Sequence, residues 1–159
     1  MEQYTFFLVF LAIMTFAKYL VFIKAKTNAD IYLKPFSTHM EHGRWSTNFI
    51  QGNVKFIGRY QEKAVRLSYN VGDHGATFNL TCSVLNIQPA KKKSWFTLLQ
   101  NCPHLGDGFQ LNGNTVFYSK KVKYWGAPES SDIPEAEELL NRLIRKCGEV
   151  ENRNLVRKR

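Results

Sequence analysis

Residues 4–23 read YTFFLVFLAIMTFAKYLVFI, a run in which Lys18 is the only charged residue. An α-helix rises about 1.5 Å per residue, so this run spans about 30 Å, which is the thickness of the hydrocarbon core of a bilayer. Its apolar residues lie all round the helix rather than in one stripe, a pattern typical of a helix that contacts lipid on every side. The sequence therefore predicts a transmembrane helix at 4–23.

Two other interpretations of the N-terminus compete with a membrane span. A secretory signal peptide would begin with basic residues and end at a small-residue cleavage site. This chain begins Met1-Glu2-Gln3, has no Lys or Arg before the apolar run and has no convincing cleavage site after it. A buried helix of a soluble domain would be apolar along one stripe only. Both alternatives stay open, and the membrane span is favoured.

Basic residues flank the apolar run on one side. Lys24, Lys26 and Lys34 follow it, whereas no Lys or Arg precedes it. Lys18, near the end of the run, can extend its side chain toward the same interface. Since cytoplasmic flanks carry the excess of Lys and Arg, we expect the N-terminus outside and the C-terminal domain in the cytoplasm. Lys24, Lys26 and Lys34 are then predicted to contact the membrane surface, where anionic headgroups attract basic residues.

The rest of the chain is polar and long enough for one domain with its own core. No repeat or low-complexity block divides it. We expect a juxtamembrane segment at 24–44, a small α+β domain at 45–151 and a basic tail at 152–159. The net charge of +9 fits a domain that is drawn to anionic lipid.

Apolar and polar residues alternate with a period of two from residue 54 onward, which is typical of antiparallel strands with one face on a core. The three clearest stretches are 54–60, 65–71 and 78–84. Short turns between them predict a meander. Asn112-Gly113 predicts a hairpin within 109–118, and residues 121–125 extend its second strand or add another.

Three other segments have weaker patterns. Residues 31–33 precede Pro35 and are interpreted as a short strand, and 39–45 as a polar loop or short helix. The segment 91–100 fits a helical turn or a strand equally well.

The last element is an amphipathic helix. Asp132 can cap it, with Pro134 in the first turn and Glu135 at a capping-box spacing. Its apolar stripe consists of Ile133, Ala136, Leu139, Leu140, Leu143, Ile144, Cys147 and Val150. Such a stripe usually packs across a sheet, and the alternative is pairing with a second copy, to form a homo-oligomer, or with another membrane protein. The predicted fold is thus α+β, with a meander of five to seven strands and one C-terminal helix on the sheet.

The cysteines are few and odd in number, which does not suit a disulfide framework. Cys82 and Cys147 fall at apolar positions and are expected to be buried free thiols. Asn79-Leu80-Thr81 is a glycosylation sequon, which would matter only if the domain faced a lumen.

Candidates for chemistry are Cys102 with His104, and His39 with His42. A nucleophilic cysteine needs a base and a group that orients the base, and a zinc site needs three or four ligands. Neither set is complete in the sequence, and no phosphate-binding or dinucleotide-binding motif is present. We therefore expect no enzyme, cofactor or metal, with a membrane-tethered enzyme or metal-binding protein using these residues as the alternative.

Residues 120–125 interleave lysines with aromatic side chains, as a nucleic-acid stacking platform would. A strand with one apolar face has the same alternation of lysines with apolar and aromatic residues. A membrane tether also makes nucleic acid a less natural partner. The function that we expect is a non-catalytic binding or assembly module at a membrane surface, with membrane lipid and a protein partner as its contacts.

Overall fold

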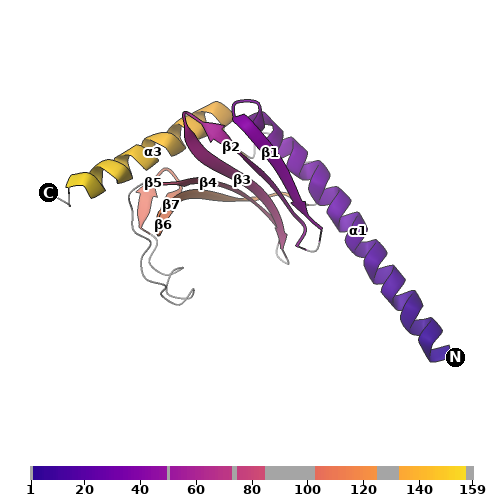
Figure 1. The fold of residues 1–159 in the computed structure, drawn as a ribbon. Coiled ribbons are helices and arrows are strands. Elements are labelled where there is room, and N and C mark those ends of the chain that lie inside the picture. Colours follow the sequence, from indigo (N-terminus) through magenta and orange to yellow (C-terminus); the bar gives the residue numbers. More distant parts are fainter. Residues whose placement is uncertain (1, 50, 73–74, 85–102, 125–132, 157–159) are drawn as a thin grey trace.

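The computed structural model describes residues 2–49, 51–72, 75–84, 103–124 and 133–156. The chain forms a long N-terminal helix, a seven-stranded antiparallel sheet and a C-terminal helix (Figure 1), which confirms the predicted α+β fold. The elements are α1 (Glu2–Ser37), β1 (Glu41–Asn48), β2 (Asn53–Tyr60), β3 (Lys63–Gly72), β4 (Gly75–Ser83), β5 (His104–Gly106), β6 (Phe109–Asn112), β7 (Thr115–Val122) and α3 (Ala136–Val156).

The strand order in the sheet is β1-β2-β3-β4-β7-β6-β5. The first four strands form a meander, which contains the three strands predicted from alternation. β7 then pairs with β4, and the hairpin predicted at Asn112-Gly113 joins β6 to β7. Gly113 has a φ of 59°, in the left-handed region that such a tight turn favours.

One face of the sheet carries the core. The side chains that alternate inward along β3 and β4 are fully buried: Val65, Leu67, Tyr69, Phe78, Leu80 and Cys82. α1 covers β2 and β3 on this face, α3 covers β4 and β7, and the two helices also contact each other. Figure 1 shows the sheet bending into an arch, with both helices on its outer side and no other helix or strand of the described residues on its concave face.

α1 continues without a break from the apolar run into the domain. Residues 31–33 are therefore helical, and the short strand predicted there is wrong. The physical reason is packing, because Tyr32 and Leu33 are buried against the sheet on the same stripe as Ala25 and Ala29. Pro35 lies inside the last turns of the helix.

β1 corrects a second prediction, because residues 41–48 are an edge strand rather than a polar loop or short helix. All its residues are exposed, so it carries no alternation of apolar side chains that would reveal a strand. The pairing shifts register between Glu41 and Arg44, and His42 has a φ of 52°. Gly43 lies against the ring of Phe56, where a Cβ would come within 1.9 Å of Cζ.

α3 lies across the sheet with its apolar stripe buried, as predicted. Its first turn differs: the Glu135 carbonyl accepts the bond from Leu139 N (3.0 Å) and the helix begins at Ala136, so Pro134 precedes the helix. An ion pair between Lys63 Nζ and Glu151 Oε1 (2.7 Å) ties α3 to β3. Because the stripe is occupied by the sheet, it offers no apolar face to a second copy. Asp132 lies outside the described residues.

Candidate functional site

The N-terminal part of α1 is the most unusual surface of the molecule. Every side chain from Tyr4 to Val21 is exposed, including Phe6 at 77 % and Leu11 at 52 %. We call this stretch, Tyr4–Val21, the free half of α1, and residues 22–37 the packed half. The helix is long and apolar enough to cross a membrane or to act as a signal sequence, and none of its apolar window is buried inside the molecule.

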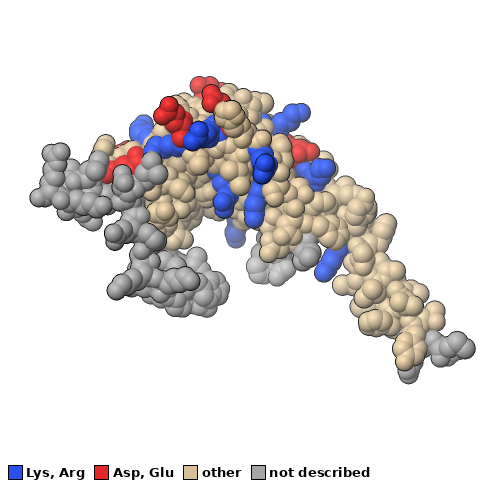
Figure 2. Space-filling view, in the orientation of Figure 1, with Lys and Arg blue, Asp and Glu red and all other residues tan. Residues whose placement is uncertain are grey.

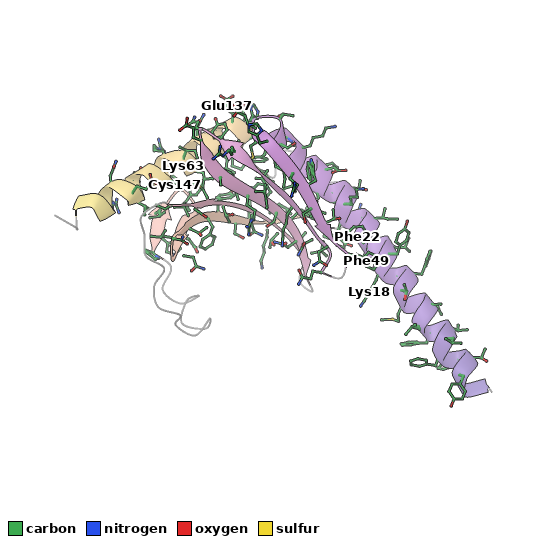
Figure 3. The ribbon with its side chains drawn as sticks, viewed as in Figure 1. Lys18, Phe22, Phe49, Lys63, Glu137 and Cys147 are labelled. Atoms are coloured by element: carbon green, nitrogen blue, oxygen red, sulfur yellow. The ribbon has the colours of Figure 1, made fainter. Side chains whose placement is uncertain are left out.

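Two contacts mark where the free half ends. The ring of Phe22 lies edge-on to that of Phe49 at the end of the β1–β2 hairpin, with centroids 5.2 Å apart (Figure 3). The hydroxyl of Tyr124, which follows β7, donates to the Val21 carbonyl at 3.3 Å. The end of the sheet that carries Phe49 and Tyr124 is therefore next to the free half, and we call it the proximal end.

A buried polar contact fixes the packed half. Asn28 is 1 % exposed, and its Nδ2 donates to the Tyr69 hydroxyl (3.2 Å) and to the Tyr124 carbonyl (3.0 Å). Burial raises the pKa of Tyr69, although the hydrogen bond from Asn28 opposes this shift. The side chain of Asn28 thus links α1 to β3 and to the segment after β7 at once.

The three lysines predicted to contact a membrane all lie on the packed half. Lys24 and Lys26 follow the apolar run directly. Lys34 is eleven residues beyond Ile23, so it lies about 16 Å further along the helix axis. That distance exceeds a Debye length of about 8 Å at physiological ionic strength. Lys34 borders a shallow apolar depression with Ile31 and Pro35, and its contact with a membrane surface stays a prediction.

The candidates for chemistry are not gathered into one site in the part of the chain that the structure describes. His39 lies between α1 and β1, and His42 lies on β1. His104 lies on edge strand β5, where its Nδ1 is 3.5 Å from Nε2 of Gln110. Cys102 and the segment 91–100 are outside the described residues. Among those described, no group of three or more His, Cys, Asp or Glu side chains could hold a metal ion.

Cys82 on β4 and Cys147 on α3 are buried free thiols, as predicted, and they form a hydrogen bond with each other. This hydrogen bond, together with burial, raises the pKa of the Cys147 thiol far above its ordinary value. The thiolate is the nucleophilic form of cysteine, so Cys147 is held in an unreactive state.

The open concave face of the sheet is the surface that reasoning from the sequence missed. Pairing places five basic side chains on it: Arg44, Lys55, Arg59, Arg66 and Lys121. We call it the basic face. The sequence carries one signal of this surface, because strands β2 to β7 contain no Asp or Glu. Which face of the sheet each lysine and arginine occupies depends on the strand register, which the sequence does not show.

Comparison of the chain with protein-family models, with curated proteins and with solved structures gave no match to any of them. Function must therefore be argued from the surfaces described above.

Proposed function

We propose that the free half of α1 spans a membrane and that the chain is a single-pass, non-catalytic binding module held against the membrane surface. The observation that carries this proposal is the exposure of every side chain from Tyr4 to Val21 on a helix that elsewhere packs into the domain core. The free half is about 27 Å long, close to the hydrocarbon thickness of a bilayer. Exposed apolar surface of this extent is unfavourable in water.

The continuity of α1 supports a rigid attachment. A flexible linker would let the domain change its distance from the bilayer and its orientation. Here the helix that enters the lipid is also part of the domain core. Lys24 and Lys26 then stand at the membrane surface, and the absence of Lys and Arg before the apolar run favours a cytoplasmic domain with the N-terminus outside. Among the described residues, the thiols of Cys82 and Cys147 are buried and His42 and His104 lie on opposite edge strands, so we favour a binding role.

Extraction of membranes with alkaline carbonate tests the proposal on the full-length chain. A protein held by a transmembrane helix stays in the pellet, whereas a peripheral protein is released. The matched variant carries Leu11→Arg and Met14→Arg, each of which costs about 3 kcal/mol in the middle of a membrane helix. We expect the unaltered chain in the pellet and the variant in the supernatant. Release of the unaltered chain would end the proposal.

Two further measurements separate the alternatives. A cleaved signal peptide would remove the free half, and the intact mass of the mature protein would show the loss. Protease protection of a tag fused to the C-terminus measures the topology. Digestion of the tag from the cytoplasmic side supports the proposed orientation, and protection of the tag inside the vesicle supports the opposite orientation.

A further inference from the structure

The charged side chains of the basic face are nearly all positive. The strands that form most of it, β2 to β7, carry no acidic residue, and the acidic residue of β1, Glu41, lies at the outer corner opposite Arg59. Among the ion pairs of the described residues, none uses Arg44, Lys55, Arg66 or Lys121. Within the described residues, these cations therefore have no carboxylate in ion-pair contact.

The acidic side chains gather on the other side of the molecule. Glu137, Glu138 and Glu149 project from α3, which covers the outer side of the arch. In Figure 2 the red atoms lie along the upper side, next to the helices, and the blue atoms extend over the hollow underside of the sheet. The domain thus has a positive concave side and an opposite side that carries most of the visible negative charge.

Polar uncharged side chains lie beside Lys55 on the basic face, whereas Ile57 stands in register between Arg44 and Arg66. Lys55 on β2 stands in register with Ser68 on β3 and Asn79 on β4. Nδ2 of Asn79 and Nδ2 of Asn70 lie 3.5 Å and 3.3 Å from the Ser68 hydroxyl. Hydroxyl and amide groups beside Lys and Arg are the donors that recognise phosphate oxygens.

The placement of the anchor decides which anion this surface meets. Lys121 is near the C-terminal end of β7, and the chain reaches the Tyr124 contact with α1 just after it, so Lys121 belongs to the proximal end. Figure 1 shows that the concave face opens toward the side to which the free half of α1 runs. With the free half in lipid, the basic face is turned toward the membrane surface.

We infer that the basic face binds the phosphate-bearing headgroups of anionic lipids in the same membrane that holds α1. This inference rests on the proposed membrane anchor for its geometry. Its occupant is named from charge complementarity and from the direction of the open face. Arg59 stands opposite Glu41 at the end of the sheet away from the free half, so it contributes least. Each of the other cations strengthens binding about fivefold where it comes close to an anionic surface.

The test uses the full-length protein in a non-ionic detergent and titrates it with short-chain phosphatidylserine, followed by calorimetry. Short-chain phosphatidylcholine measures non-specific entry into the micelle. We expect saturable binding of phosphatidylserine that exceeds phosphatidylcholine and weakens with added salt. Replacement of the basic-face cations by Lys55→Gln, Arg66→Gln and Lys121→Gln should weaken it by roughly a hundredfold.

A matched variant distinguishes the basic face from net charge. Lys34→Gln, Arg145→Gln and Arg153→Gln remove three exposed cations from the helices and should leave binding unchanged. Equal loss in both variants, or equal binding of the two lipids, would overturn the inference. Inorganic phosphate or an acidic peptide binding more tightly than phosphatidylserine would also overturn it, in favour of a soluble anion or a protein segment.

We expect both variants to fold, because all six side chains lie at the surface or are half-buried. Thermal unfolding of each variant checks this. The titration is done in detergent, so its failure leaves the anchor standing, whereas failure of the carbonate extraction removes the anchor whatever the titration shows.

Discussion

The two halves of α1 have the same backbone conformation and opposite surroundings. In the packed half the buried residues Ala25, Ala29, Tyr32 and Phe36 recur at spacings of three and four, and the charged residues Lys26, Asp30 and Lys34 lie exposed between them. In the free half the apolar residues surround the helix and none is buried. The comparison teaches that the arrangement of side chains, rather than helix formation, separates a lipid-facing segment from one that belongs to a domain core.

The largest expected contrast comes from removing one ring in each half. Phe36 is 2 % exposed and its ring lies 5.1 Å from that of Phe78. Phe36→Ala should lower the free energy of unfolding of the domain by about 3–5 kcal/mol, because it leaves a cavity. Phe10→Ala, in the free half, should leave it unchanged. Chemical denaturation of both full-length variants in detergent measures this, and equal effects would erase the distinction between the halves.

A smaller contrast concerns polar side chains. Asn28→Ala removes the hydrogen bonds that Nδ2 donates to the Tyr69 hydroxyl and to the Tyr124 carbonyl. Both buried oxygens then lose this donor. We expect a loss of about 1–3 kcal/mol in the same denaturation experiment. The control is Thr15→Ala, since the Thr15 hydroxyl bonds only within its own helix, to the Leu11 carbonyl at 2.8 Å. A neutral Asn28→Ala would mean that the packed half is held by apolar contacts alone.

The smallest contrast is the response to alkaline pH. Burial raises the pKa of Tyr69 in the folded chain above the value of about 10 in the unfolded chain. The folded protein then keeps a proton that the unfolded chain loses, so stability falls as the pH rises above about 10. Tyr69→Phe should flatten this fall, as followed by denaturation at a series of pH values. Tyr4→Phe in the free half is the control, and an unchanged slope for Tyr69→Phe would refute the assignment.

Much of this architecture can be predicted from the sequence. The apolar run, the strands β2 to β4, the hairpin at Asn112-Gly113 and the stripe of α3 are strong periodic patterns with matching turn signals. Each of these elements is determined by the spacing of apolar residues or by a turn motif within its own segment. No knowledge of tertiary contacts is therefore needed to predict it.

The remaining features depend on contacts between distant segments. The packed half contains Asn28 and Pro35, which are poor helix residues, and it is helical because α1 continues onto the sheet. β1 is an exposed edge strand, so it shows no alternation. The basic face collects its five cations from four strands, β1, β2, β3 and β7, and only the register of the pairing shows that Arg44, Lys55 and Lys121 share one side.

The most direct measurement compares one exposed position in each half of α1 in a lipid bilayer. Leu11 is 52 % exposed and Ile31 is 40 % exposed, so burial within the protein does not separate them. Nitroxide labels at Leu11→Cys and Ile31→Cys, with Cys102→Ser, report collisions with oxygen, which dissolves in lipid, and with a nickel reagent, which stays in water. We expect oxygen to dominate at residue 11 and nickel at residue 31. Equal access of nickel to both positions would contradict the division of α1 into a lipid half and a domain half.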